Sequence, residues 1–378
     1  MSDIYQESLA LHKKYHGKLA VVSKVPLKTR ADLSLAYTPG VAEICRVIAA
    51  DKSQARELTL KGNTVAVVSD GSAILGLGNL GPEAALPVME GKCVLFKEFA
   101  GVDAFPICLD TQDEEEIIKA VKYLAPVFGG INLEDISAPR CFKIEERLKA
   151  ELDIPVMHDD QHGTATVVLA ALINALKLRG LEKEKARLVI SGSGAAGSAI
   201  TKLLLDYGFK DIIVGDRGGL IYEGRDDLNA EKKKLAAITN RQKISGTLSE
   251  AIKGADIFIG VSAPGLLNAA MVKSMNERPI IFALANPVPE IMPDEAQAAG
   301  AFIVATGRSD FPNQINNVLA FPGIFRGALD NKVRQITDAM LVRAAENLAA
   351  LVAAPTPDRI LPDPFAKEVV KAVAAAIR

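Results

Sequence analysis

Two adjacent pairs of carboxylates are the residues of this chain best placed to do chemistry. Glu134 and Asp135 directly follow one short apolar segment, and Asp159 and Asp160 directly follow another. We interpret both segments as strands, and open α/β sheets bind their ligands at the C-terminal ends of strands. Acid pairs at loop ends are usually solvated, but four like charges in one crevice are costly without a cation. If the two strands are neighbours, this all-oxygen cluster predicts an Mg²⁺ or Mn²⁺ site.

The stretch 157–166 contains the second pair and is interpreted as the joint between a substrate region before it and a cofactor region after it. His158 and His162 flank the two aspartates and could be ligands, but lone histidines more often pack or orient a ligand. An apolar segment of helical length, residues 164–178, follows. The aspartates are therefore expected at a strand end, ahead of a helix.

A glycine-rich loop in the second half has the context of a dinucleotide site. Gly192, Gly194 and Gly197 spell G-x-G-x-x-G between a predicted strand and a predicted helix, and Asp216 ends the next strand, 19 residues beyond Gly197. The glycines let backbone N–H groups approach a pyrophosphate at a helix N-terminus, and Asp216 can accept hydrogen bonds from the adenosine ribose. The predicted cofactor residues here are Gly192, Ser193, Gly194, Ala195, Ala196, Gly197 and Asp216.

The choice between the two nicotinamide cofactors stays open at this stage. Asp216 favours an unphosphorylated ribose, whereas Arg217 beside it could pair with a 2′-phosphate. NAD is therefore expected to be only slightly preferred to NADP.

A second G-x-G-x-x-G, formed by Gly76, Gly78 and Gly81, lies in the first half. An Asp-Gly turn precedes it, and no acidic residue closes a second strand at the required distance. These glycines are expected to form tight turns that bring backbone near a ligand, not to bind the main cofactor.

The elements around these motifs predict an α/β protein with two lobes, since 378 residues are too many for one ordinary core. Residues 1–160 are expected to form an N-terminal α/β substrate domain, and residues 161–378 a Rossmann-like doubly wound dinucleotide-binding domain with C-terminal helices. Expected strands include 64–69, 104–109, 211–214, 257–260, 280–284 and 302–305; expected helices include 1–22, 41–50, 113–124, 140–152 (charged on its outer face), 330–353 and 364–378.

Composition and charge narrow the classes of partner. The chain has 44 Lys+Arg against 46 Asp+Glu, which gives no basic surface for nucleic acid. No apolar run reaches the roughly 18 residues of a membrane span, and the polar, acidic N-terminus is unlike a secretory signal. The 4 cysteines are scattered without a CxxC pair. They favour reduced thiols in a cytoplasmic protein over a zinc site or a disulfide framework.

Taken together, these motifs resemble the malic enzymes over nearly the whole chain. The resemblance is carried, in order, by segments 37–42, 76–81, 133–136, 159–165, 286–287 and 316–318. The length is similar to that of the short prokaryotic form, without the C-terminal phosphotransacetylase-like extension of some bacterial members. The resemblance implies an N-terminal substrate lobe followed by a Rossmann lobe, and a homodimer or higher oligomer.

The resemblance also implies a role for each matching residue. Glu134, Asp135 and Asp160 correspond to the metal ligands. Lys92 corresponds to the base that takes the C2 hydroxyl proton, Asp159 to its charged partner, and Tyr37 to the acid that protonates the enol product. Asn286 and Asn317 correspond to contacts with substrate and nicotinamide. In isolation Tyr37 would be read as a packing residue and Lys92 as a solvated one.

One position departs from the family pattern. Larger eukaryotic members carry an arginine before the first glycine loop that binds a malate carboxylate, and Ala73 stands in that place here. The residue that neutralises this carboxylate is not evident from the sequence.

The implied activity is metal-dependent oxidative decarboxylation of L-malate to pyruvate and CO₂ with reduction of NAD(P). A base at position 92 must be neutral, and burial beside Cys93 and Val94 together with a nearby cation predicts a depressed pKa for Lys92, against the pull of Asp159. Three alternatives are considered: a malolactic enzyme that releases lactate, a non-catalytic dinucleotide sensor, and a metal-independent amino- or hydroxy-acid dehydrogenase. The joint presence of Lys92, Tyr37 and the acids argues against the last two.

Overall fold

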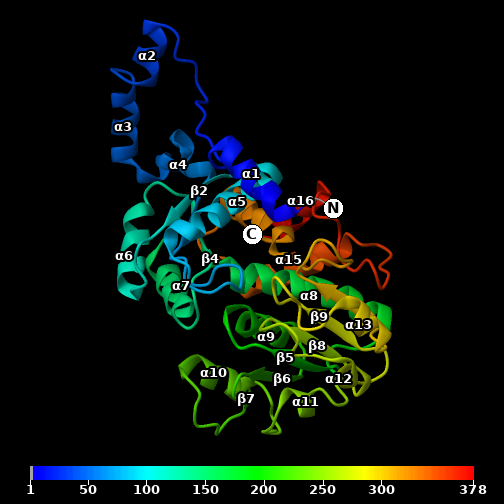
Figure 1. Cartoon of the computed structure of the whole chain (residues 1–378). Coiled ribbons are helices and arrows are strands. Elements are labelled where there is room, and N and C mark those ends of the chain that lie inside the picture. Colours follow the sequence, from blue (N-terminus) through cyan, green and yellow to red (C-terminus); the bar gives the residue numbers. More distant parts are fainter. Residues whose placement is uncertain (1–2) are drawn as a thin grey trace.

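The computed structural model describes residues 3–378 and places the strands in two separate sheets, each flanked by helices (Figure 1). One sheet has four strands and the other has six, and each forms the centre of one lobe. This is the two-lobed α/β architecture that the sequence predicts.

The first sheet has the strand order β2-β1-β3-β4, and its neighbouring strands are parallel. Its strands are β1 (Thr64–Ser69), β2 (Asp103–Cys108), β3 (Gly130–Leu133) and β4 (Val156–His158), and its helices are α5 (Pro82–Ala100), α6 (Glu114–Leu124) and α7 (Arg140–Glu151). Every residue of β1 is buried, as expected of a central parallel strand. Leu133 of β3 lies opposite His158 of β4, so the residues that follow these two strands meet at one edge of the sheet.

The second sheet has the order β10-β9-β8-β5-β6-β7, with only β7 antiparallel to its neighbour. Its strands are β5 (Arg187–Ser191), β6 (Asp211–Asp216), β7 (Gly219–Leu220), β8 (Ile257–Gly260), β9 (Ile280–Ala283) and β10 (Ile303–Thr306), and its helices are α9 (Ala195–Tyr207), α10 (Ala230–Ile238), α11 (Leu248–Ala251), α12 (Ala269–Lys273) and α13 (Pro293–Ala298). The chain runs from β5 to β6 in one direction and from β8 to β10 in the other. The crevice between β5 and β8 is therefore the switch point of a doubly wound fold.

Helix α8 (Asp159–Arg179) joins the two lobes and begins earlier than the sequence predicts. It packs on α9 and on the C-terminal helices, and most of its residues are buried. A helix that is apolar on every side belongs in a core. The expected start at residue 164 is wrong: Asp159 and Asp160 form the first turn, where the helix dipole favours negative charge.

The C-terminal segment forms α14 (Phe321–Asp330), α15 (Asp338–Ala350) and α16 (Glu368–Ala376); α14 packs on α5 and β3 of the first lobe, and α15 packs on α8 and α9. The rings of Phe321 and Phe325 stand edge-on to Phe96 of α5, with centroids 4.8 and 5.5 Å away. The single helix expected over 330–353 is wrong, because Lys332 has a left-handed φ of 52° and a new helix begins at the Thr337 cap.

The N-terminal segment leaves the body after α1 (Ile4–Tyr15) and projects from it as α2 (Arg30–Ala36) and α3 (Val41–Ala50) before returning through η1 (Lys52–Gln54), α4 (Ala55–Leu58) and η2 (Leu60–Asn63) (Figure 1). We call residues 19–50 the arm. Neither α2 nor α3 contains a buried residue, although both carry apolar side chains.

The arm contains one stretch, Arg30–Ala50, that is long enough and, with a mean hydropathy of 1.2, apolar enough to span a membrane, contrary to expectation. The stretch is divided at residues 37–40 into helices of 7 and 10 residues. Each is much shorter than the roughly 20 residues of a continuous membrane helix.

Candidate active site

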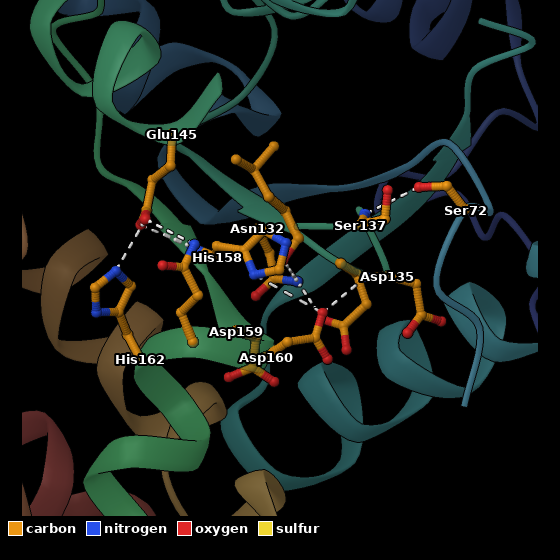
Figure 2. A network of polar contacts seen from close by, with 12 residues as sticks. Ser72, Asn132, Asp135, Ser137, Glu145, His158, Asp159, Asp160 and His162 are labelled. Carbon is orange, nitrogen blue, oxygen red and sulfur yellow. Dashed lines mark hydrogen bonds and ion pairs between the residues drawn. The ribbon is translucent and has the colours of Figure 1, made fainter. Parts of the chain in front are cut away.

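The two carboxylate pairs meet where the sequence predicts, at the ends of β3 and β4 (Figure 2). The backbone N–H of Asp135 donates to Oδ2 of Asp160 over 2.8 Å. Asp135 has a left-handed φ of 53°, an uncommon conformation for a residue other than glycine. Asn132, which the sequence analysis did not single out, donates from Nδ2 to Oε2 of Glu134 over 2.9 Å and so orients that carboxylate.

Lys92 of α5 reaches into the same cluster from the opposite side. Its Nζ lies 2.6 Å from Oδ2 of Asp159 and 2.9 Å from Oε1 of Glu134, and its side chain is only 7% exposed. The ammonium group also stands 4.1 Å from the ring centroid of Phe321, a favourable cation–π position. The pairing of Lys92 with Asp159 that the resemblance implies is therefore present in a single chain.

The pKa of Lys92 is raised by its carboxylate neighbours, whereas the expected depression assumes a cation beside the lysine. Burial alone lowers the pKa of this lysine, but Asp159 and then Glu134 outweigh burial and favour the ammonium form. Burial also raises the pKa of the Asp159 carboxyl to about 7, which would favour a neutral pair. Because Lys92 bridges two carboxylates and faces an aromatic ring, we take the lysine to be charged in this state.

The carboxylates fit a divalent cation by donor type and by charge. Oδ2 of Asp135 and Oδ1 of Asp159 are buried without a hydrogen-bond partner. Burial and mutual repulsion raise the pKa of Glu134, Asp135 and Asp160, and Lys92 is the only cation that pairs with the cluster within residues 3–378 at the distances above. In that described range no three His, Cys, Asp or Glu side chains surround one point as metal ligands, because Glu134 faces Lys92 and Asp160 faces the Asp135 N–H.

Glu145 of α7 holds the start of α8 in place, and the sequence analysis missed it. Its carboxylate accepts the backbone N–H of His158 over 3.0 Å, lies 2.9 Å from Nε2 of His162 and pairs with Lys149 over 2.7 Å (Figure 2). The charges of α7 were expected on its outer face, but Glu145 is 5% exposed. Glu145 lies four residues after the apolar Cys141, so the two share one helix face, and this spacing indicates that Glu145 is on the buried face.

His162 takes part in this support through its ring and His158 through its backbone N–H, and neither ring nitrogen of His158 has a hydrogen-bond partner. His162 pairs with Glu145, as described, and burial lowers the pKa of His158 to about 4, which keeps that ring neutral. Nδ1 of His158 lies 3.8 Å from Oδ2 of Asp160. Their expected role as orienting or packing groups agrees with this geometry.

The first glycine loop forms a contact between the lobes. Gly76 has a φ of 74°, and a Cβ added there would lie 2.5 Å from the carbonyl oxygen of Asn286. The side chain of Asn286 in turn lies against Gly307, where a Cβ would be 2.8 Å from its Nδ2. Asn317 is near the carboxylates: a Cβ on Gly163 would meet both Asp159 and the Cβ of Asn317. Asn286 thus lies against the glycine loop of the first lobe, and Asn317 lies beside Asp159 at the start of α8.

The second glycine loop has the geometry of a dinucleotide site. Gly192 follows β5 with a φ of 117°, and α9 begins at Ala195 with Gly194 as its cap. A Cβ on Gly197 would lie 1.9 Å from the carbonyl oxygen of Gly192, so only glycine fits this turn. Gly194 supplies no side-chain cap to α9, which is consistent with the predicted role of this helix end.

Asp216 ends β6 but is already paired. Its carboxylate binds Arg225 over 2.8 Å and Lys232 over 2.6 Å. Burial alone would raise the pKa of Asp216, but Lys232 and Arg225 lower it. Neither cation was predicted, because both come from the segment after β7.

Tyr37 is not brought to Lys92 within one chain. It caps α2 in the arm, its side chain is 67% exposed, and α2 and α3 project away from the body that carries α5 (Figure 1).

Comparison with known proteins identifies the family. Residues 16–149 match the model "Malic enzyme, N-terminal domain", and residues 161–378 match "Malic enzyme, NAD binding domain". The chain belongs to the malic enzyme family. It is 57% identical over 375 residues to the bifunctional malic/malolactic enzyme of Bacillus subtilis, covering 98% of this chain and 92% of that relative.

Two further malic enzymes agree with this assignment. The NAD-dependent malic enzyme of Geobacillus stearothermophilus is 58% identical, over 96% of this chain and 76% of the relative. The crystal structure of the NAD-dependent malic enzyme of Thermotoga maritima superimposes with a TM-score of 0.95 at 52% identity, covering 100% of this chain and 99% of the other. The resemblance and the fold class predicted from the sequence are confirmed.

Proposed function

We propose that this malic enzyme catalyses the reaction L-malate + NAD(P)⁺ → pyruvate + CO₂ + NAD(P)H in the crevice between its lobes. The observation that carries the proposal is the buried Lys92–Asp159 pair, 2.6 Å apart, next to the carboxylates that follow β3 and β4. The relatives named malic enzymes support it.

In this reaction Lys92 accepts the proton of the malate C2 hydroxyl as hydride leaves C2 for the nicotinamide. Since Lys92 is charged at rest, it must first release a proton, and Asp159 is the acceptor within 2.6 Å. Glu134, Asp135 and Asp160 are the residues that would hold Mg²⁺ or Mn²⁺. When bound, such a cation supplies Lewis-acid stabilisation for the negative charge that develops as CO₂ departs.

The dinucleotide is proposed to lie across residues 192–197, with its nicotinamide near Asn286 and Asn317. NAD is proposed to be preferred, because Asp216 stands where the adenosine ribose would bind. Arg225 and Lys232 neutralise much of its charge, so the preference over NADP is expected to be small.

A malolactic reaction is the second candidate, since a relative 57% identical is named a bifunctional malic/malolactic enzyme. One assay tests both. Purified protein with L-malate, Mn²⁺ and either NAD or NADP is followed at 340 nm while pyruvate and lactate are measured. Pyruvate formed in equal amount to reduced cofactor supports the malic reaction, and lactate without net reduced cofactor supports the malolactic one. Turnover that persists in EDTA would contradict the metal-dependent mechanism.

The arm is proposed to dock on a second copy of the chain and to deliver Tyr37 to that copy's site. Its apolar side chains, among them Val22 at 79% and Leu35 at 78%, are exposed in the single chain. Exposed apolar patches of this kind mark protein contacts, and a reciprocal exchange closes as a two-fold dimer. Tyr37 would then protonate C3 of the enol product formed beside the partner's own lysine.

Mixed dimers test this arrangement. Chains carrying Lys92→Ala and Tyr37→Phe are co-expressed with different tags, and dimers that carry both tags are isolated. If Tyr37 acts on the partner's site, one site of the two combines an intact lysine with an intact tyrosine, and roughly half of wild-type activity returns. Each homodimer alone stays impaired.

The matched control combines Lys92→Ala with Asp135→Asn. Both residues belong to the body of the chain, so neither site of this mixed dimer is complete and no recovery is expected. Absence of recovery in the Lys92→Ala and Tyr37→Phe mixture would place Tyr37 in its own chain's site or outside catalysis.

A further inference from the structure

Glu290 is a fully buried carboxylate that the proposed reaction does not use. Its side chain is 0% exposed and lies after β9, on the segment that follows Asn286. Burial raises the pKa of Glu290, and only backbone N–H groups, not a cation, act against that shift. A buried carboxylate without a cationic partner costs stability unless its hydrogen bonds are well placed.

The two oxygens of Glu290 bind two different loops. Oε1 accepts the backbone N–H of Ser262 over 3.0 Å, and Oε2 accepts the backbone N–H of Ala285 over 3.1 Å. Gly260 of β8 pairs with Ala283 of β9, and Ser262 and Ala285 each stand two residues beyond this pair. One carboxylate therefore bridges the two chain segments that leave the C-terminal ends of β8 and β9.

The sequence makes room for this bridge at Gly260. A Cβ at that position would lie 2.3 Å from Cδ of Glu290, which is a steric clash. The carboxylate can therefore sit between the loops only because β8 ends in glycine. The same loop continues the linkage, since the hydroxyl of Ser262 lies 2.9 Å from that of Ser191, the last residue of β5.

The two bridged loops lie on the β8 side of the switch point, opposite the side of β6 and Asp216. A dinucleotide that crosses the switch point with its adenosine at β6 places its nicotinamide over β8 and β9. Ala285 is followed by Asn286, whose carbonyl oxygen faces Gly76 of the other lobe. The Glu290 bridge therefore lies on the side of the switch point where the nicotinamide is expected to bind.

We propose that Glu290 is a positioning residue that fixes the loops after β8 and β9 so that they can hold the nicotinamide ring. The proposal rests on the proposed NAD(P)-dependent function for the orientation of the cofactor. Glu290 binds the loops after β8 and β9 directly, whereas it reaches the pyrophosphate loop only through the loop after β8, which packs against Gly192. Its effect should therefore be larger on the nicotinamide half of the dinucleotide than on the ADP-ribose half.

Binding of NADH and of ADP-ribose, which lacks the nicotinamide, tests the proposal without turnover. NADH affinity is measured by its fluorescence, since the chain contains 0 Trp residues to interfere, and ADP-ribose affinity by calorimetry. Glu290→Gln replaces one accepting oxygen with a donor that opposes an N–H group. We expect it to weaken NADH binding on the order of tenfold and to weaken ADP-ribose binding much less.

Gly260→Ala is the independent second variant, because its methyl group displaces the carboxylate without removing it. It should give the same selective loss of NADH affinity. Asp256→Asn is the matched control. Asp256 is a buried carboxylate of the same lobe that binds Arg179 and the Arg187 N–H. It directly precedes β8, so it lies at the N-terminal end of the strand and not at the end that Glu290 bridges. This control variant should lower the Tm without changing the ratio of the two affinities.

Equal weakening of both ligands in Glu290→Gln and Gly260→Ala, or no weakening in either variant, would overturn the positioning role. Wild-type protein that bound neither ligand would instead contradict the proposed function itself, so the two failures are distinguishable.

Discussion

Replacing Lys92 with alanine is expected to lower kcat for malate oxidation by on the order of 10²- to 10⁴-fold, the usual contribution of a positioned proton acceptor. The side chain contacts Asp159 and Glu134 directly, and no other lysine pairs with either carboxylate in the described part of the chain. The C2 hydroxyl proton would then have no acceptor. The measurement is steady-state kinetics with L-malate and saturating Mn²⁺.

Lys92→Arg is the companion variant, because arginine keeps the positive charge but does not release a proton at neutral pH. If Lys92 acts as a base, Lys92→Arg should be as inactive as Lys92→Ala while it restores thermal stability lost with the buried charge. NADH binding should survive in both, since the glycine loop lies on the other lobe. An arginine variant with near-normal kcat would show that position 92 supplies charge alone.

The sequence predicts the carboxylate cluster and the dinucleotide loop because both depend on local patterns. Glu134 directly follows β3 and Asp159 directly follows β4. Because these two strands are parallel neighbours, their C-terminal ends lie side by side. The glycines at 192 and 197 and Asp216 likewise follow from the order of strand, turn and helix. The structure places these residues at one edge of the first sheet, at the turn after β5 and at the end of β6, while their roles stay predictions.

The parts that were missed depend on which elements pack together. The direction of the Lys92 pKa shift depends on α5 lying against two carboxylates, and sequence alone cannot weigh burial against those contacts. Glu145 and Glu290 are buried charges whose partners are backbone N–H groups or side chains of other elements. Neither belongs to a motif, so the fold was needed to find them.

Errors at helix ends have a similar cause. The sequence places the start of α8 five residues late, because Asp159 to Gly163 carry no apolar pattern. These residues are helical because Glu145 holds the first turn through His158 and His162. Tyr37 shows the opposite limit: its motif is visible in the sequence, but its position in an exposed arm, away from Lys92, is seen only in the fold.

Asp135→Asn is expected to abolish the response of the protein to Mn²⁺ while leaving NADH binding intact. The change keeps the size of the side chain but removes one anionic ligand from a set of three, and hard cations bind carboxylate much better than amide. In wild-type protein a bound cation should stabilise the fold by RT ln(1 + [cation]/Kd), so the Tm should rise with the logarithm of the cation concentration above its Kd, and this rise should be lost in the variant. Activity with malate at limiting Mn²⁺ should fall by at least roughly 100-fold, as expected when a metal ligand is removed.

The sign of the stability change without metal gives a second, independent check. Burial and the neighbouring Asp160 and Glu134 raise the pKa of Asp135 in the folded chain. A carboxyl with a raised folded pKa costs stability once the pH exceeds its unfolded value of about 3.9, and the cost grows as pH rises towards the folded pKa. In EDTA at neutral pH, Asp135→Asn should therefore have a Tm equal to or higher than wild type, whereas the control Asp256→Asn, which breaks satisfied contacts, should have a lower one. A variant that loses stability in EDTA and still gains Tm with Mn²⁺ would show that Asp135 supports the fold and not the cation.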